Sequence, residues 1–374
     1  MMSKEEMQRR WSLTRAVMRE DGLDWIVCTL GHPFGYAKWL AGRVGLAGTL
    51  VAFPVKGDLI LATHGDAVHH RPYDSEGVRH IATCAQPNLL ANTHAAALID
   101  QIRDCAPKRI GFVGLGYLSA ATYATFLKLL PDVDFVDATD SLAAIKAVKS
   151  DEELVHMRAA AALHDQAVEL VRANVRPGLA PKQIIEVVRS FMCTQGSASQ
   201  TFMAGSAPPG QPCKYAGPQD RVMEKGDQFA MLIECSDSEG YYSEAMPTLC
   251  IGEIPAPLAR AHADVLEIQS TLVSMLRPGI QVSELLRVND EFMVRKGYPP
   301  EQRLLGHAQG LDLVERPAAT PSGENLVIQK DMVFSVHPTV HAEQAWGFPV
   351  NLSFLITNGK AEPMLKTSNT IFVV

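Results

Sequence analysis

Hydrophobic and polar positions follow two periodicities over residues 1–145. Apolar residues three and four positions apart predict amphipathic helices in EEMQRRWSLTRAVMRE, THAAALIDQIRD and SAATYATFLKLL. Short apolar runs predict strands in DWIVCTL, GTLVAFPV, DLILATH, RIGFVG and DFVDAT, and the segment GHPFGYAKWLAGRVG is typical of turns. Helices between short strands favour a smaller α/β domain over residues 1–145, with a layered sheet and some parallel pairing.

The pattern changes at Ser150, where SDEE offers a capping box: the Ser150 hydroxyl can accept from the backbone three residues on, and Glu153 can reach back. Two helices follow, then a Gly- and Pro-rich loop, GSAPPGQPCKYAGPQD. Strands come next in QFAMLIECSD and GYYSEAMPTLCIGE, then two more helices and a last set of strands. This order predicts an α+β domain over residues 146–374, with helices on one face of a curved antiparallel sheet.

Composition narrows the function classes. The chain has 374 residues, a formal net charge of -7 and no dense cluster of Lys and Arg, so we expect neither nucleic acid nor a membrane as a partner. Charges recur throughout MMSKEEMQRRWSLTRAVMRE, and no later stretch reaches the ~18 uncharged apolar residues of a membrane span, so we expect a cytoplasmic protein. The seven cysteines lack a C-x-x-C pair and indicate neither a disulfide framework nor a Cys-rich zinc site.

Four separated blocks of the second domain resemble the creatinase, prolidase and methionine aminopeptidase group. They are KGDQFAMLIECSDSEGYYSEAMPTLCIGE, RPGIQVSELLRVNDEFMVRKGY, GHAQGLDLVERP and DMVFSVHPTV, the last followed by an L-I-T strand and NGK. The resemblance covers residues 146–374 in detail, and the first 145 residues look like the smaller creatinase/prolidase-type domain. It implies the pita-bread fold, usually as a homodimer.

The resemblance also implies a metal site, but with substituted ligands. Metallopeptidases of this group hold two metal ions with two Asp, one His and two Glu. The matching positions are here, in chain order, Glu234, Glu244, His307, His337 and Asn351, and four of the five differ from the family pattern. Because four anionic ligands fall to two, two neighbouring dications would lack compensating charge, and we expect no dinuclear site.

Two interpretations of the cluster stay open. Glu244, His307 and His337 could form a two-His, one-carboxylate set for one divalent transition metal. Alternatively the site is free of metal, as in creatinase, and imidazole and carboxyl groups carry out acid–base chemistry directly.

Other positions also depart from the family. Val314 stands where the peptidases carry a second, proton-shuttling His. The loop His of the family falls in QPCKYAG, where Cys213, Lys214 or Tyr215 must replace it, and the sequence does not choose among the three.

Several residues are candidates for contact with substrate. Arg316, in VERP, lies near the point where creatinase holds its substrate's carboxylate, and a guanidinium binds a carboxylate through two parallel hydrogen bonds. Further candidates are Arg43, Trp346 and Asn351. A carboxylate in the apolar run FAMLIE is costly unless it is paired or ligating, which favours a functional Glu234. We expect Asp237 and Glu239, in the following turn, to be solvated.

The leading hypothesis is a hydrolase that cleaves a C–N or other C–heteroatom bond of a small carboxylate-bearing molecule. In it His307 or His337 is the general base, Glu234 and Glu244 hold a cationic group or one metal ion, and Arg316 takes the carboxylate. Met246 stands where creatinase would carry a glutamate, so creatinase activity itself is not expected. The alternatives are a metal-dependent Xaa-Pro aminopeptidase or dipeptidase, a lyase, and a non-catalytic peptide-binding module.

Overall fold

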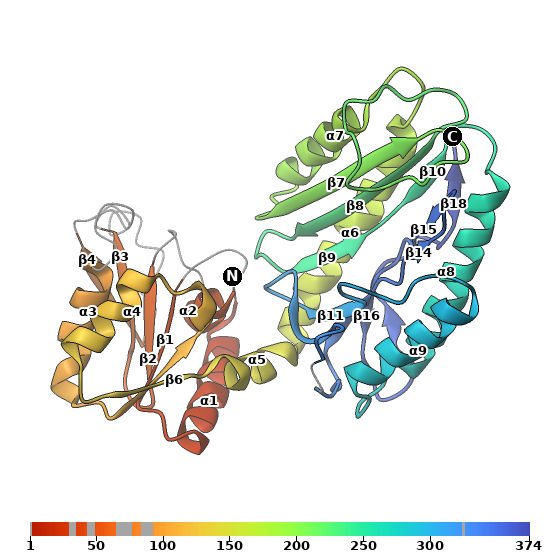
Figure 1. The fold of residues 1–374 in the computed structure, drawn as a ribbon. Coiled ribbons are helices and arrows are strands. Elements are labelled where there is room, and N and C mark those ends of the chain that lie inside the picture. Colours follow the sequence, from red (N-terminus) through yellow and green to blue (C-terminus); the bar gives the residue numbers. More distant parts are fainter. Residues whose placement is uncertain (1, 30–34, 43–48, 65–76, 84–92, 324–325) are drawn as a thin grey trace. The chain divides into compact units, whose positions relative to one another are not determined.

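The chain forms two compact units, Met1–Lys146 and Ala147–Val374, each with its own sheets and core. The computed structural model describes residues 2–29, 35–42, 49–64, 77–83, 93–323 and 326–374 (Figure 1).

The N-terminal unit is built on a six-stranded sheet in the order β4-β3-β2-β1-β5-β6. Its strands are β1 (Trp25–Thr29), β2 (Leu50–Pro54), β3 (Leu59–His64), β4 (Val78–Thr83), β5 (Arg109–Val113) and β6 (Asp134–Asp137). Strand β1 pairs antiparallel with β2 and parallel with β5. This mixed pairing agrees with the α/β class that the sequence predicts.

Helices cover both faces of this sheet. They are α1 (Lys4–Glu20), α2 (Tyr36–Ala41), α3 (Thr93–Ile102) and α4 (Ala120–Leu129), with α5 (Thr139–Ala147) at the end of the unit. On one face Leu98 and Phe126, from α3 and α4, pack into a buried cluster with Val27. On the other face Trp11 of α1 lies 6.3 Å from Phe53, between ring centroids. The sequence analysis missed α2, α5 and β4; α2 is short and almost wholly buried, so it shows no helical period.

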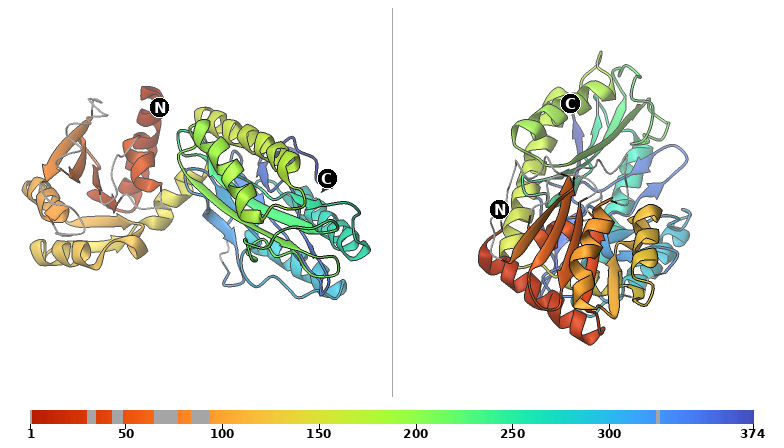
Figure 2. Two further views of the ribbon diagram at one scale, coloured as in Figure 1. Left: turned by 90° about the horizontal axis from the view of Figure 1, so that it is seen from above. Right: turned by 90° about the vertical axis from the view of Figure 1, so that its left-hand side faces the viewer.

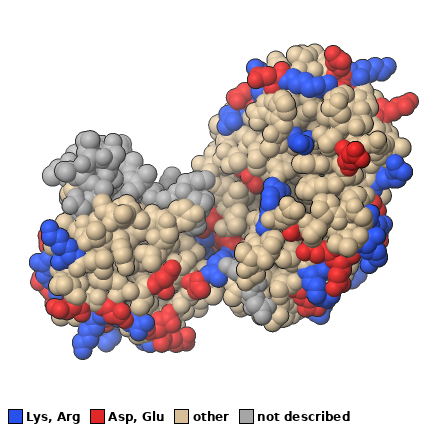
Figure 3. All heavy atoms as spheres, in the orientation of Figure 1, with Lys and Arg blue, Asp and Glu red and all other residues tan. Residues whose placement is uncertain are grey.

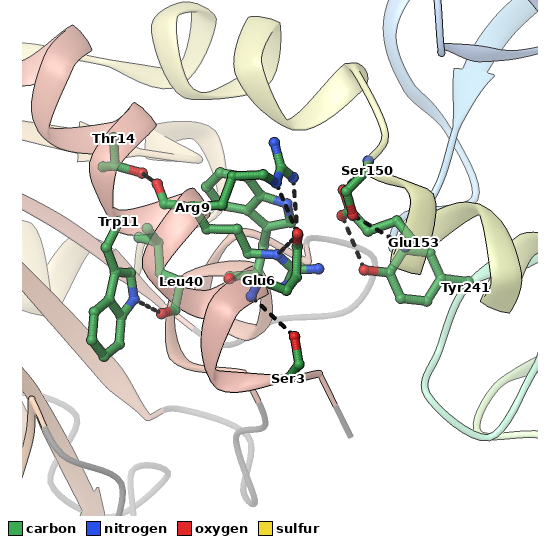
Figure 4. A network of polar contacts seen from close by, with 11 residues as sticks. Ser3, Glu6, Arg9, Trp11, Thr14, Leu40, Ser150, Glu153 and Tyr241 are labelled. Carbon is green, nitrogen blue, oxygen red and sulfur yellow. Dashed lines mark hydrogen bonds and ion pairs between the residues drawn. The ribbon is translucent and has the colours of Figure 1, made fainter.

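Polar contacts fasten α1 to α2 (Figure 4). Trp11 Nε1 donates to the Leu40 carbonyl at 2.7 Å, and Arg10, which is fully buried, donates to the Trp39 carbonyl at 3.2 Å. Burial raises the pKa of Glu6, but hydrogen bonds from Arg9 and Arg10 outweigh it, so the pKa of Glu6 is lowered overall.

The C-terminal unit contains two five-stranded sheets and a two-stranded ribbon. The first sheet holds β7 (Gln200–Ala207), β8 (Gln228–Ser236), β9 (Tyr242–Ala245), β10 (Thr248–Cys250) and β18 (Ile371–Val373). The second holds β11 (Gly306–Gln309), β12 (Glu315–Ala319), β13 (Val333–Val336), β16 (Ser353–Leu355) and β17 (Glu362–Pro363), and the ribbon pairs β14 (Val340–His341) with β15 (Trp346–Gly347). Strands β10 and β18 pair in parallel, and the other pairs of this unit are antiparallel.

Each large sheet buries one face beneath its own pair of helices. Helices α6 (Asp151–Asn174) and α7 (Pro181–Thr194) cover the first sheet, and α8 (Ala256–Met275) and α9 (Val282–Arg295) cover the second. Figure 2 shows α6 and α7 lying along the strands of the first sheet. The order of helices and strands in this unit is the predicted one, although the sequence analysis did not predict β7.

Strand β9 joins the two sheets. Along one edge it pairs with β8. Along the other, Tyr242 N–H donates to the Gly310 carbonyl at 2.8 Å and Met246 N–H donates to the Val350 carbonyl at 3.0 Å. The side chains of β9 therefore face residues from both sheets.

The start of α6 has the predicted capping box, with Ser150 and Glu153 bonding reciprocally. Tyr241 donates its hydroxyl to Glu153 Oε1 at 3.0 Å (Figure 4). The expectation that Asp237 is solvated was wrong: it is buried, and its Oδ2 lies 2.7 Å from His156 Nδ1. Its other oxygen accepts backbone N–H groups of the turn, which explains why a turn carboxylate is buried here.

Two further features concern the described helices and the surface of the C-terminal unit. No described helix is long and apolar enough to cross a membrane. On the face of the C-terminal unit seen in Figure 3, uncharged residues cover most of the surface and charges of both signs are interspersed.

A buried ion pair links the segment before α6 to β12. Lys149 Nζ lies 2.6 Å from Glu315 Oε2, with side chains 1% and 5% exposed, and it also donates to the Ala147 carbonyl. A Cβ at Gly310 would lie 2.6 Å from Lys149 Cε and 2.7 Å from Glu315 Oε1, so a side chain at that position would displace the ion pair.

We expect Glu315→Gln to destabilise the C-terminal unit by ~3–5 kcal/mol, because it leaves the Lys149 ammonium buried without a counter-charge. Urea unfolding followed by circular dichroism measures this. The control is Glu291→Gln in the exposed pair with Arg287, which should leave the midpoint within error. Equal midpoints for the two variants would contradict the argument.

Because His164 of α6 is buried, we expect the stability of the C-terminal unit to depend on pH. Its Nδ1 donates to the Ala160 carbonyl at 2.8 Å, its Nε2 accepts from the Cys235 N–H at 3.3 Å, and burial lowers its pKa to about 4. Between the unfolded pKa of ~6.5 and that value, only the unfolded chain takes up the proton, so stability is full above pH ~6.5 and falls as pH falls.

For this histidine the loss is ~1.4 kcal/mol per pH unit inside that window. Urea midpoints of wild type and His164→Gln, measured from pH 7.5 to 5, should therefore converge as pH falls. Parallel curves would show that the imidazole carries no such penalty.

Candidate active site

Two glutamates face each other across the strand pair β8 and β9. Glu234 is directly opposite Glu244 in the register. Because strand side chains alternate, Ile233 and Ala245 point to the helices α6 and α7, whereas the two carboxyl groups point to the other face of the sheet. Glu244 is 2% exposed.

This arrangement makes both groups weak acids. Burial raises the pKa of Glu234 to about 8, and the charge of Glu244 adds to the effect. Burial raises the pKa of Glu244 to about 7, with hydrogen bonds from Ser335 and Gln309 acting in the opposite direction. Both carboxyl groups are therefore weaker acids than exposed ones, and their two titrations belong to the pair rather than to either residue.

Two imidazoles lie against this pair. His307 of β11 and His337, just after β13, have ring centroids 5.3 Å apart, and His307 Nε2 is 3.5 Å from Glu244 Oε1. The register of β11 with β12 shifts immediately after His307, a bulge of the kind that redirects side chains at active sites. The sequence analysis thus named four residues that the fold brings together.

The protonation of His307 follows from its neighbours. Its Nδ1 lies 2.9 Å from the Ala308 carbonyl, an acceptor only, so Nδ1 carries the proton and Nε2 presents a lone pair to Glu244. Burial lowers the pKa of His307 to about 4, and burial together with His307 lowers that of His337 to about 3. Two acceptor atoms, Nε2 and Oε1, therefore face each other, which favours a proton or a metal ion between them.

A polar layer behind the pair holds Glu244 in place. Gln309 Nε2 donates to Glu244 Oε1 at 3.0 Å, and Ser353 donates to Gln309 Oε1 at 3.0 Å. Ser335, opposite His307 in the register, also bonds Glu244. The sequence analysis missed these three residues, although polar side chains at every second position of GHAQG and FSVHP carry the signal.

Glu244, His307 and His337 fit a single metal ion. Their ligand atoms all lie within 4.8 Å of one another, and among the described residues no other group of three or more His, Cys, Asp and Glu meets this condition. Two imidazole nitrogens and one carboxylate suit a divalent transition metal such as zinc or iron. Glu234 is outside this group.

Asn351 lies beside the same strand. It forms a backbone bridge with Ala245 and is 5% exposed. Its Nδ2 donates to the Leu365 carbonyl at 3.1 Å, while its Oδ1 has no hydrogen-bond partner among the described residues.

The other residues that the sequence singled out lie at different places in the fold. Arg316 lies on β12 and is partly exposed, and its neighbour Glu315 pairs with Lys149 instead. Val314 is exposed. Arg43 lies outside the described residues.

The structure separates the three candidates for the missing loop histidine. Cys213 is buried with its Sγ 3.3 Å from the Gly205 carbonyl, and burial raises its pKa to about 12. Lys214 Nζ lies 5.6 Å from the ring centroid of Trp346, and the Tyr215 hydroxyl accepts from Arg303 at 2.8 Å. Lys214 and Tyr215 therefore remain candidates, and Arg303 is a neighbour that the sequence analysis did not name.

Comparisons with known proteins identify the family. Residues 155–358 match Peptidase_M24, metallopeptidase family M24. Similar proteins include the uncharacterized hydrolase/peptidase y4tL of Sinorhizobium fredii, 29% identical over 73% of this chain and 70% of that protein. Ectoine hydrolase of Halomonas elongata is 23% identical over 99% of this chain and 98% of that protein. A solved Xaa-Pro dipeptidase from Bacillus anthracis has a TM-score of 0.81 at 20% identity, covering 98% of this chain and 100% of that one.

Because the family match spans more than half of the sequence, the chain belongs to metallopeptidase family M24. It is a hydrolase of this family with the prolidase-type pita-bread fold. The family resemblance and the fold class predicted from the sequence are both confirmed.

We expect the purified protein to take up about one divalent transition-metal ion per chain, held by Glu244, His307 and His337. Elemental analysis by mass spectrometry, on protein prepared without a metal-binding tag and then dialysed against zinc, measures this. His337→Ala should lose the ion, whereas His80→Ala, an exposed histidine of β4, should keep it. Two ions per chain, or unchanged uptake in His337→Ala, would contradict the assignment.

Proposed function

We propose that the C-terminal unit hydrolyses a C–N bond of a small carboxylate-bearing molecule. The observation that carries this proposal is the Glu234–Glu244 pair, opposite each other in the register and faced by the Nε2 lone pair of His307. Such a cluster of proton donors and acceptors at one place is what water addition and leaving-group protonation need.

Glu234 is the group best placed to move the proton. It faces Glu244 but lies outside the candidate metal group, and it is only partly buried. As the water oxygen bonds to the carbon, one water proton passes to the carboxylate; a proton then passes to the nitrogen as the C–N bond breaks. The net change is the addition of one water molecule.

His307 and His337 act as neutral rings in this scheme. Their nitrogens position the attacking water or a cationic part of the substrate, or hold one metal ion together with Glu244. A bound divalent ion would supply Lewis acidity at this point.

The similar proteins include enzymes named for a small molecule and enzymes named for dipeptides. Ectoine hydrolase is similar over nearly the full length of both chains, and ectoine is a small cyclic amidine with one carboxylate. A second candidate is Xaa-Pro dipeptidase activity, because dipeptidases are also among the similar proteins. The substituted ligand set, with His337 and Asn351 in place of two carboxylates, counts against the two-metal chemistry of such peptidases.

A substrate panel tests the proposal. It contains ectoine, creatine and N-acetylglycine, with Ala-Pro and added manganese as the peptidase probe. We expect C–N cleavage of at least one non-peptide carboxylate and little turnover of Ala-Pro. Glu234→Gln should lower kcat ~10²–10⁴-fold, the range for loss of an acid–base group, whereas Glu239→Gln in the neighbouring turn should not.

Products formed in ¹⁸O-labelled water separate hydrolysis from elimination, since only hydrolysis places the label in the product. Turnover restricted to Ala-Pro with manganese would replace this proposal by the dipeptidase. No turnover of any panel member would remove it.

A further inference from the structure

Two cations border an aromatic cluster beside the carboxyl pair, and neither is paired with an acid. Lys214 Nζ lies over the ring of Trp346 at 5.6 Å from its centroid, and Arg303 donates to the Tyr215 hydroxyl at 2.8 Å. No carboxylate of the described residues lies within 4.0 Å of either cation. Glu301, the acid closest in sequence to Arg303, instead accepts the backbone N–H groups of residues 302 and 303.

The cluster adjoins the active site on the side of the first sheet. Leu232 and Met246 pack with Phe348, Tyr215 and Trp346. Leu232 is two residues before Glu234 on β8, and Met246 is two residues after Glu244. Residues two apart on a strand share a face and lie ~7 Å from each other, so the aromatic cluster continues the surface that carries the two carboxyl groups.

Arg303 lies on the segment before β11, near a backbone contact with His337. The N–H of His337 donates to the Leu305 carbonyl at 3.0 Å, two residues after Arg303. His341, which lines one cavity with Arg303, has its ring centroid 4.4 Å from that of Trp346. Arg303 thus approaches the site from the second sheet, and Tyr215 from the loop between β7 and β8.

The loop is held close to the sheet by its neighbours. A Cβ at Gly205 would lie 2.0 Å from the Lys214 carbonyl, so only glycine lets this segment approach β7. The Tyr215 ring packs edge-on against Phe348 with centroids 5.7 Å apart. These contacts position Tyr215, whose hydroxyl accepts from Arg303.

We propose that Arg303, oriented by Tyr215 and assisted by Lys214, binds the carboxylate of the substrate while the scissile C–N bond lies at Glu234 and Glu244. This inference rests on the proposed function for the class of ligand. One guanidinium N–H is used by Tyr215, and the others remain for a planar, bidentate contact with a carboxylate. Arg303 takes the role that the sequence analysis gave to Arg316.

A cavity lies beside Arg303, on the side of α9. Arg303, Thr339 and His341 line a cavity of about 140 Å³, in which Glu301 supplies the one carboxylate. Since a water molecule occupies ~30 Å³ of liquid, this volume suits a ligand of several heavy atoms.

Fluorine NMR on protein labelled with 5-fluorotryptophan tests the site without requiring turnover. Trp346 is one of four tryptophans, and its resonance is assigned with Trp346→Phe. The full-length protein is titrated with ectoine and with N-acetylglycine, and N-acetylglycinamide serves as the uncharged probe.

We expect a saturable shift of the Trp346 resonance with a carboxylate and none with the amide. Arg303→Ala should weaken this binding at least tenfold. The affinity of Arg303→Lys should lie between those of wild type and Arg303→Ala, because lysine keeps the charge and loses the planar, bidentate guanidinium group. Arg277→Ala, an exposed control between α8 and α9, should leave the affinity unchanged. The inference is overturned if no carboxylate shifts the resonance, if Arg303→Ala binds like wild type, or if only Arg316→Ala loses binding.

Hydrolysis assays on the same variants keep this inference separate from the proposed function. Binding that depends on Arg303 without any hydrolysis supports the carboxylate site and removes the hydrolase proposal. Hydrolysis with an unchanged KM in Arg303→Ala supports the hydrolase proposal and removes the carboxylate site.

Discussion

The double pairing of β9 is the constraint on which the active site depends. This strand bonds to β8 along one edge and to the backbone of Gly310 and Val350 along the other, so it fixes the two sheets of the C-terminal unit in one register. Its Glu244 then faces Glu234 across one pairing and His307 across the other. A slip by one residue would turn Glu244 toward the helices and dismantle the cluster.

Burial shifts the pKa values of the four groups in the cluster, and it also costs free energy of folding. Two carboxyl groups and two imidazoles removed from water favour their neutral forms, which raises the pKa of the acids and lowers that of the bases. The hydrogen bonds from Gln309, Ser335 and Ser353 offset part of that cost and hold Glu244 in one orientation. The same polar layer prepares a site for one metal ion or one shared proton.

Family membership explains the fold around this site but not which residues occupy the site. The M24 match covers residues 155–358 and accounts for the helices and sheets of the C-terminal unit. In our interpretation of the sequence, His337 and Asn351 stand where relatives carry carboxylate ligands, and this lower negative charge disfavours two neighbouring dications. Lys214 and Arg303 add positive charge at the neighbouring aromatic residues Trp346 and Tyr215.

The sequence by itself determined the features that depend on local physics. Amphipathic periods predicted the long helices, and SDEE predicted the capping box, because those bonds join residues a few positions apart. Residue types at family-like spacing also named Glu234, Glu244, His307 and His337. Only the tertiary structure decided the rest: the burial of Asp237, the ion pair of Lys149 with Glu315, and the contact of Arg303 with Tyr215. The last two join residues 166 and 88 positions apart, and no local pattern encodes which distant side chains a fold brings into contact.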